Sequence, residues 1–365
     1  MSQTPAAVET RDLSKHYGDV KALQHVDLEI TAGEYFVLLG PSGGGKTTLL
    51  RTIGGFHRPT SGQVLLHGND VSHLPPDKRP TSMVFQGYAL FPHMTVLGNV
   101  GYGLSLAKLP KDEIKSRADD MLKMVGLDGY ADRKPHELSG GQQQRVQLAR
   151  SLVLNRDILL LDEPLAALDA QLRKDMCLEL KHLQEQVGIT FIHVTHNQEE
   201  AMTVADRIAL IAEGHLIELG KARDIYENPV QRFTAAFVGE NNVLDGEVAS
   251  VDEQFVTLMI AGHPVRIAND GQPFKVGDAA SMSIRSELTA IAANDKLASL
   301  PDGCNLPATY RESVYLGLTN SHRFALDNDT EVQSRVVSEN IEPGLTPGQQ
   351  MHLYWQPGEA RLHQR

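Results

Sequence analysis

The stretch Tyr35-Phe-Val-Leu-Leu-Gly-Pro-Ser-Gly-Gly-Gly-Lys-Thr47 decides the fold class of this chain. Residues 35–39 form a short apolar run that is typical of a buried strand, and the run from Thr47 to Ile53 predicts a helix. Residues 40–47 match the pattern G-x-x-x-x-G-K-[ST], which surrounds phosphate groups when it joins a strand to a helix. The segment therefore predicts a phosphate-binding loop in an α/β fold.

The chemistry of phosphate binding explains the residue types in this loop. Glycines allow backbone N–H groups to turn inward around phosphate oxygens, and a helix N-terminus adds about half a unit of positive charge. We expect Lys46 to neutralise the β- and γ-phosphates of a nucleotide and Thr47 to ligate Mg²⁺. Further contacts to the nucleotide are expected from the neighbouring loop residues Gly40, Ser42, Gly43, Gly45 and Thr48.

A second apolar run, residues 158–161, ends in two acidic residues, Asp162 and Glu163. Asp162 at a strand end can hold Mg²⁺ through water, and Glu163 can orient or deprotonate an attacking water. Acidic residues are common at strand ends, so this feature alone indicates little. Together with the phosphate-binding loop it predicts a P-loop nucleoside triphosphatase.

The texture of the chain changes near residue 240. Before this point strand-like and helix-like segments alternate, which predicts a mostly parallel sheet with helices on its faces. Beyond it, short strand candidates are separated by Gly, Pro, Asn and Asp, which predicts a small all-β region. The net charge changes as well, from 25 − 30 = −5 over residues 1–240 to 9 − 16 = −7 over residues 241–365. We therefore predict two domains, 1–240 and 241–365.

The second domain contains a faint internal repeat. The glycine of Val276-Gly-Asp278 lies seven residues before Ile284, and the glycine of Pro347-Gly-Gln349 lies seven residues before Trp355. This spacing predicts a barrel-like region that is built from two related halves.

Composition excludes several other classes of protein. The chain has 365 residues, of which 41% are hydrophobic and 22% charged, and at about 150 residues per domain it holds two or three domains. We find no apolar run near the ~20 residues of a membrane-spanning helix, no secretory-signal pattern and no disulfide framework. The net charge of 34 − 46 = −12 argues against general binding to nucleic acid.

The segment Leu138-Ser-Gly-Gly-Gln-Gln-Gln-Arg145 predicts a second anion site. Two glycines precede a helix that we expect to begin near Gln142, so Ser139 and the N–H groups of Gly140 and Gly141 would face a phosphate. Two such sites in one chain suggest a sandwich in which each of two copies completes the other's site. Here the chain resembles the ATP-binding subunits of ABC transporters, whose signature is Leu-Ser-Gly-Gly-Gln, over essentially all of residues 8–365.

The resemblance implies roles for four further residues and adds Gln142, as part of the signature, to the ATP contacts. Tyr17 matches the aromatic residue that stacks on adenine, and Gln86 matches the glutamine that contacts Mg²⁺ and the attacking water. Asp169 matches the D-loop at the dimer interface, and His196 matches the switch histidine that hydrogen-bonds the γ-phosphate. The implied fold is an ABC ATPase domain with a helical subdomain, followed by an oligonucleotide-binding-fold-like β domain.

Within this family, the run Phe85-Gln-Gly-Tyr-Ala-Leu-Phe-Pro-His-Met-Thr-Val96 resembles importer subunits for polyamines, ferric ion and sugars. Ile284-Arg-Ser-Glu287 resembles a motif of their C-terminal regulatory (TOBE-type) domain, with Ser286 where proline is usual. The second copy, Trp355-Gln-Pro-Gly358, has glycine where glutamate is usual. The resemblance implies a polyamine importer first, with ferric iron or another small solute as the alternative.

The resemblance also implies the partners. We expect a head-to-tail homodimer around two Mg·ATP, two membrane permease subunits, a solute-binding protein, and a peripheral position on the cytoplasmic face of the inner membrane. One rival is a soluble ABC ATPase of translation or DNA repair, but such chains usually carry two cassettes or a long coiled-coil insertion. Another is a non-catalytic regulatory binder, which the presence of Glu163 and His196 argues against.

Overall fold

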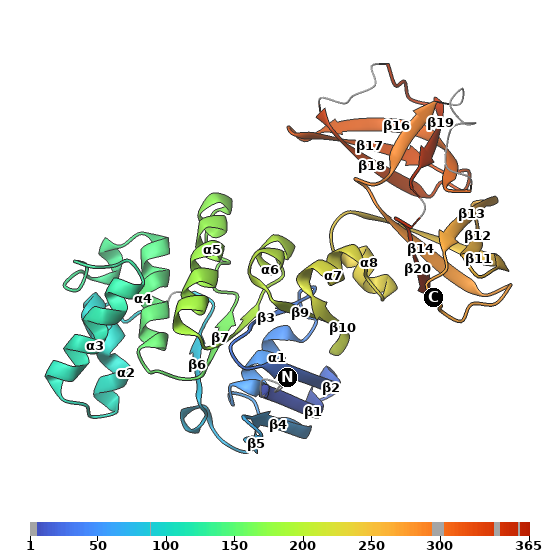
Figure 1. The fold of residues 1–365 in the computed structure, drawn as a ribbon. Helices are drawn as coiled ribbons and strands as arrows, with labels where there is room; N and C mark the ends of the chain where they lie inside the picture. The colour runs from blue at the N-terminus through green and yellow to red at the C-terminus, as the bar shows by residue number, and fades with distance from the viewer. Residues whose placement is uncertain (1–5, 88, 294–302, 339–343, 357) are drawn as a thin grey trace. The chain divides into compact units, whose positions relative to one another are not determined.

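The computed structural model describes residues 6–87, 89–293, 303–338, 344–356 and 358–365. The chain folds into two compact units, Met1–Ala222 and Arg223–Arg365 (Figure 1). The first unit is a layered α/β structure and the second is built mainly of antiparallel strands. The predicted fold class is therefore confirmed.

The central sheet of the first unit has six strands in the order β10-β9-β3-β8-β7-β6. All its neighbouring strands are parallel except β9 and β10. Every residue of β3, β7 and β8 is buried, as expected for parallel strands that are covered on both faces. The bounds are β3 (Tyr35–Leu39), β6 (Thr81–Val84), β7 (Ile158–Asp162), β8 (Thr190–Val194), β9 (Arg207–Ala212) and β10 (His215–Lys221).

A second, antiparallel sheet has the order β2-β1-β4-β5. Its apolar side chains pack with those of β3 and of α1 (Lys46–Ile53) in one core, so α1 lies close to both sheets. This packing holds the loop before α1 between the two sheets. The strands are β1 (Ala6–Tyr17), β2 (Val20–Thr31), β4 (Ser61–Leu66) and β5 (Asn69–Asp70).

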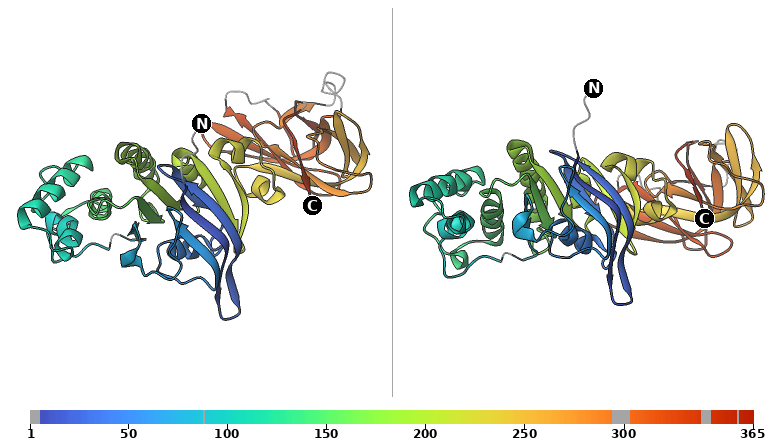
Figure 2. Two further views of the ribbon diagram at one scale, coloured as in Figure 1. Left: turned by 60° about the horizontal axis from the view of Figure 1, so that its bottom comes forward. Right: turned by 90° about the horizontal axis from the view of Figure 1, so that it is seen from below.

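Three helices between β6 and β7 form the predicted helical subdomain: α2 (Val96–Leu106), α3 (Lys111–Met124) and α4 (Gly140–Leu152). They gather to one side of the six-stranded sheet in all three views (Figures 1 and 2). Two more helices, α5 (Ala170–Val187) and α6 (Gln198–Val204), follow β7 and β8, and short 3-10 turns lie at Pro76–Lys78 and Pro135–Glu137. Within the described ranges, no helix is long and apolar enough to cross a membrane.

The second unit contains α7 (Ala222–Glu227), α8 (Arg232–Phe237) and two five-stranded antiparallel sheets. Their orders are β13-β12-β11-β14-β20 and β15-β19-β16-β17-β18. The first sheet comprises β11 (Asn241–Val251), β12 (Phe255–Ile260), β13 (His263–Ala268), β14 (Ala279–Arg285) and β20 (Arg361–Gln364). The second comprises β15 (Ala290–Ala293), β16 (Asn305–Tyr315), β17 (Thr319–Ala325), β18 (Glu331–Val337) and β19 (Gln350–Tyr354).

The two sheets repeat one pattern and exchange their last strands. Strands β11 to β14 correspond in order to β16 to β19, but β15 pairs with β19 and β20 pairs with β14. Gly277 and Gly348, the glycines of the predicted repeat, have φ of +91° and +88° in turns before β14 and β19. The two related halves are thus present, and Pro357 of the second motif lies outside the described residues.

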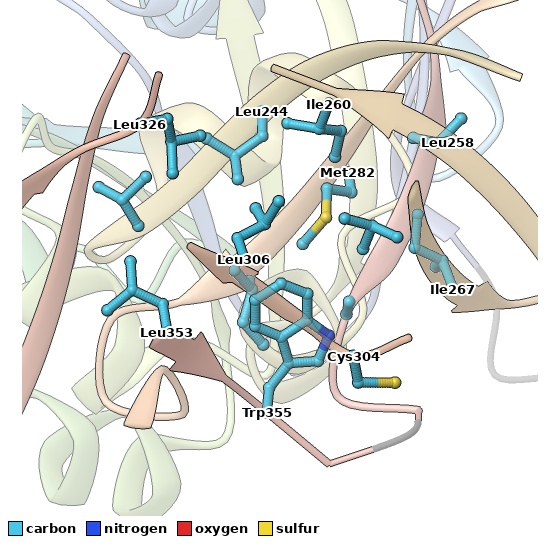
Figure 3. Packing of buried hydrophobic residues seen from close by; sticks show 14 of the residues in the cluster. Leu244, Leu258, Ile260, Ile267, Met282, Cys304, Leu306, Leu326, Leu353 and Trp355 are labelled. Atoms are coloured by element: carbon cyan, nitrogen blue, oxygen red, sulfur yellow. The ribbon is translucent and has the colours of Figure 1, made fainter. Parts of the chain in front are cut away.

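One apolar core joins the two sheets of this unit. A single cluster contains Leu244 and Met282 from the first sheet, Leu306 and Leu353 from the second, and Trp355. The Trp355 indole is directed toward the inside of this cluster (Figure 3). Each half alone would leave this face exposed to water. The strand exchange and the shared core therefore join the two halves in one compact unit.

The compact units divide earlier than the predicted boundary at residue 240. Helix α8 packs on β11 and β14, and Arg232 of α8 pairs with Asp245 of β11 at 2.9 Å. Arg285, in the motif that resembles the regulatory domain, donates hydrogen bonds to the carbonyls of Tyr226 and Val238. The sequence pattern changes from alternating strands and helices to short strands where the strands of the second unit begin. The packing contacts, in contrast, group α7 and α8 with the strands that follow them.

Candidate functional site

The loop between β3 and α1 has a backbone that glycine alone fits well. Gly40, Gly43 and Gly45 have φ of +148°, +77° and +108°. A Cβ on Gly40 would lie 2.0 Å from the carbonyl oxygen of Ile211, and one on Gly45 would lie 2.6 Å from that of Ala22. The loop is therefore pressed against β9 and β2, and its shape depends on these glycines.

Lys46 spans this loop from the first position of α1. Its Nζ donates to the carbonyls of Gly40 and Pro41, both at 2.8 Å, and the residue is buried. Burial lowers the pKa of Lys46, while the carboxylates of Glu163 and Asp162 act in the opposite direction. Ser42 and Gly43 are exposed at the rim of the loop. The ammonium group is thus held against the loop by two of the loop's own carbonyls.

Asp162, at the end of β7, is buried at 2% exposure and binds two residues of α1. Its Oδ1 accepts a hydrogen bond from Thr47 Oγ1 at 2.9 Å, and its Oδ2 lies 3.1 Å from Arg51 Nη2. Sequence reasoning missed Arg51. Its signal was spacing, because residues four apart on a helix share a face, so Arg51 had to lie beside Thr47.

Glu163 brings together residues from three strand ends. Its Oε2 accepts a hydrogen bond from Gln86 Nε2 at 3.2 Å, and its Oε1 lies 3.4 Å from His196 Nδ1. Glu163 has a φ of +46°, and its N–H donates to the carbonyl of Val194 at 3.1 Å. A left-handed conformation is uncommon at a glutamate. The adjacent strands β6, β7 and β8 place these three side chains together.

The loop that carries His196 is held by a network that sequence reasoning did not find. Thr195 Oγ1 donates to Glu200 Oε2 at 2.6 Å and accepts from the N–H of Asn197 at 2.9 Å. Glu200 lies 3.4 Å from Arg173 of α5, and burial raises the pKa of this glutamate. The network anchors both neighbours of His196, whose side chain is 54% exposed.

His193, on β8, is a structural histidine. His193 is fully buried, and its Nδ1 lies 3.0 Å from the hydroxyl of Tyr35. Burial lowers its pKa to about 3, so the ring is neutral at physiological pH. His193 therefore serves packing, whereas the exposed His196 side chain is accessible to a ligand.

The signature segment caps its own helix. Helix α4 begins at Gly140, two residues before the predicted start, because Ser139 and Gln142 form a capping box. The Ser139 N–H donates to Gln142 Oε1 at 3.0 Å, and Gln142 Nε2 donates to the hydroxyl of Tyr130 at 3.3 Å. The Gln142 side chain is therefore committed within the chain. The N–H groups of Gly140 and Gly141 lie in the first turn, where no intrahelical acceptor exists.

Two further predicted residues, Tyr17 and Asp169, lie at element ends. Tyr17 ends β1 and is 44% exposed, with the His57 ring against it at 5.7 Å and Lys15 Nζ at 4.8 Å from its centroid. Asp169 caps α5 by accepting a hydrogen bond from the N–H of Leu172 at 3.0 Å.

The structure thus brings together the loop, Asp162, Glu163, Gln86 and His196, but not the signature segment. Helix α4 lies apart from α1 in Figure 1, and among the described residues no hydrogen bond links Ser139–Gln142 or Asp169 to this group. A glycine-rich loop that carries a lysine, beside a carboxylate, a glutamine and a histidine that lie together, suits phosphoryl transfer to water. The fold and this site define a P-loop ATPase of the ATP-binding cassette class.

A family model described as ABC transporter matches residues 23–166. A spermidine/putrescine import ATP-binding protein, PotA, from Oleidesulfovibrio alaskensis is 44% identical over 98% of this chain and 97% of that protein. The protein of the same name from Roseobacter denitrificans is 44% identical over 99% of this chain and 98% of its own length. The chain therefore belongs to the spermidine/putrescine import ATP-binding protein family of ABC transporters.

Solved structures agree with this assignment of the first unit. The cbiO1 protein of Clostridium perfringens, part of the ABC transporter complex cbiONQ, is 31% identical, with a TM-score of 0.56 over 60% of this chain and 90% of that one. A dimeric ATP-binding cassette in a post-hydrolysis state, bound to ADP and Pi, is 36% identical, with a TM-score of 0.53 over 59% of this chain and 99% of that one.

Proposed function

We propose that this chain is the ATP-hydrolysing subunit that energises a membrane importer of spermidine and putrescine. The observation that carries the proposal is the position of Glu163, one residue after Asp162 and between Gln86 and His196. The relatives that share nearly the whole length of the chain are named for spermidine and putrescine import. Those names favour polyamines over ferric iron as the solute.

The residues of the loop bind the nucleotide. Lys46, already directed across the loop, exchanges its carbonyl partners for the β- and γ-phosphates. Thr47 and Asp162 place a hydroxyl and a carboxylate side by side, the oxygen donors that Mg²⁺ prefers, with Gln86 as a further oxygen donor. A bound Mg²⁺ neutralises charge on the phosphate oxygens. Tyr17, exposed at the end of β1, offers a ring for the adenine base.

Hydrolysis needs a group that takes a proton from water and others that position it. Glu163 accepts the proton, because it is a carboxylate fixed between two hydrogen-bonding side chains. Gln86 orients the water, and His196 donates a hydrogen bond to the γ-phosphate. Arg51 pairs with Asp162 at 3.1 Å and so holds this carboxylate beside the Thr47 hydroxyl.

A second copy of the chain completes each site. The first turn of α4, with Ser139, Gly140 and Gly141, and the D-loop residue Asp169 lie outside the group that a single chain assembles. Two copies packed head to tail bring these segments to the partner's nucleotide. A related cassette of known structure is dimeric. Two permease subunits and a solute-binding protein complete the importer, with this chain peripheral on the cytoplasmic face of the inner membrane.

Crosslinking tests the head-to-tail dimer. With Cys177 and Cys304, both buried, replaced by serine, Ser42→Cys and Gly140→Cys together should crosslink between chains. The crosslink should require ATP and a Glu163→Gln background, because hydrolysis reopens the dimer. Ser42→Cys paired with Ser105→Cys, an exposed position on α2, is the matched control and should not crosslink. Crosslinks within one chain, or crosslinks without nucleotide, would contradict the sandwich.

Uptake of labelled solute tests the substrate. In the organism that encodes the chain, deletion of its gene should abolish energised uptake of spermidine or putrescine. The parent chain should restore uptake, and Glu163→Gln at equal abundance should not, because binding without hydrolysis cannot reset the importer. Uptake of ferric iron serves as the parallel measurement. Loss of iron uptake with unchanged polyamine uptake would overturn the choice of solute while leaving the ATPase assignment intact.

A further inference from the structure

The segment that follows β6 is held in place by helix α4. The Gln147 side chain is buried at 2% exposure, and its Nε2 donates to the carbonyls of Phe85 at 3.0 Å and Gly87 at 3.1 Å. These two carbonyls belong to the residues on either side of Gln86. One amide group therefore fixes the backbone before and after the residue whose side chain reaches Glu163.

Arg150 extends this contact one helical turn further. Its Nη1 donates to the carbonyl of Ala89 at 2.9 Å, and its guanidinium carbon lies 5.4 Å from the centroid of the Phe91 ring. Gln147 and Arg150 are three residues apart on α4 and so share one face of the helix. The same face of α4 therefore contacts Phe85, Gly87, Ala89 and Phe91.

The backbone of this segment needs such support. Gly87 has a φ of +82° and Ala89 a φ of +44°, and both lie between the end of β6 at Val84 and the start of α2 at Val96. The segment therefore lacks the hydrogen bonds of a continuing strand or helix at these residues. Removal of the Gln147 amide would leave both carbonyls without this donor, so the segment follows the position of the Gln147 amide.

We propose that Gln147 is a positioning residue for ATP hydrolysis. It acts through Gln86, since it fixes the two neighbouring carbonyls and thereby the 3.2 Å approach of Gln86 Nε2 to Glu163. Because Ser139 caps the same helix, any shift of α4 on engagement of the signature segment is transmitted to Gln86 through this amide. The inference rests on the proposed function, because it concerns the same reaction.

The chain offers a matched control in Gln184 of α5. This glutamine is 3% exposed, and its Nε2 also donates to two backbone carbonyls, those of Gly33 at 2.7 Å and Ile189 at 3.1 Å. Gln147→Leu and Gln184→Leu remove the same group from equally buried positions. A purely structural role predicts similar effects of both changes, whereas a positioning role predicts a catalytic defect for Gln147→Leu alone.

Steady-state hydrolysis by the full-length chain separates these roles. Gln147→Leu should lower kcat by about tenfold, with KM for ATP and the unfolding midpoint close to those of Gln184→Leu, because a small displacement of a positioning group mainly affects the chemical step. On a Gln86→Ala background, Gln147→Leu should cause no further loss of kcat. Equal kcat for the two leucine variants, or multiplicative losses with Gln86→Ala, would overturn the proposal.

Hydrogen–deuterium exchange tests the same idea without turnover. In the nucleotide-free chain, peptides that cover residues 85–91 should exchange faster in Gln147→Leu than in the parent, and at the parent rate in Gln184→Leu. Unchanged exchange in Gln147→Leu would overturn the inference even if hydrolysis were active. If the parent chain shows no hydrolysis but the exchange result holds, the proposed function fails while the restraint on Gln86 stands.

Discussion

Glu163→Gln is expected to lower kcat for ATP hydrolysis by about 10²–10⁴-fold, the usual contribution of a positioned general base. The amide keeps the length of the side chain and can still accept a hydrogen bond from Gln86, so the site should keep its shape. It cannot take a proton from water. ATP affinity should therefore change little, and the ATP-bound dimer should persist. Single-turnover hydrolysis and sedimentation with ATP measure the two effects.

The control for this variant is Glu213→Gln. Glu213 is also a glutamate with a left-handed backbone, at φ +50°, but it is exposed after β9. Its substitution tests the effect of removing a carboxylate from a strained turn and should leave hydrolysis unchanged. Turnover by Glu163→Gln within about tenfold of the parent would refute the assignment of Glu163 as the base.

Lys46→Ala is expected to weaken ATP binding by about 10²-fold, because charge-assisted hydrogen bonds to the phosphates are lost in a partly desolvated site. The carbonyls of Gly40 and Pro41 would also lose their donor, so the empty loop should become less ordered. Isothermal titration calorimetry with ATP in the presence of Mg²⁺ measures the change in Kd.

Lys181→Ala controls for the general loss of a lysine. Lys181 lies on α5 and pairs with Asp206 at 2.7 Å. Among the described residues, it makes no hydrogen bond or ion pair with the phosphate-binding loop. Its substitution should leave the Kd for ATP unchanged. An unaltered Kd in Lys46→Ala, measured on protein with the parent's unfolding midpoint, would show that this loop does not bind the phosphates.

The sequence alone determined those parts of the site that depend on local chemistry. Residues 40–47 have a spacing of glycines, lysine and threonine that suits one strand–loop–helix geometry, and their positive φ values follow from it. The apolar run that ends at Asp162 indicated a buried strand, which the structure shows as β7. The role expected of His196 came from the family resemblance, and the parallel pairing of β7 with β8 is what brings His196 close to Glu163.

Tertiary structure decided the contacts that join residues far apart in the chain. Nothing in the local sequence states that Gln147 holds the carbonyls beside Gln86, or that Glu200 meets Thr195 and Arg173. Helix α4 begins at Gly140 rather than near Gln142, because the side chains of Ser139 and Gln142 each accept a hydrogen bond from the other residue's N–H group.

Packing also decided where the compact units divide and how the β unit closes. Composition changes at the first strand of that unit, yet α7 and α8 belong with the strands that follow them. Arg232 of α8 pairs with Asp245 of β11, and Arg285 of β14 donates hydrogen bonds to the carbonyls of Tyr226 and Val238. The exchange of β15 and β20 between the two similar sheets cannot be predicted from the local hydrophobic pattern. Each sheet offers an equivalent edge strand with which β15 or β20 could pair. Periodicity determines which face of a strand is buried, whereas the choice of partner depends on chain connectivity and on the shared core.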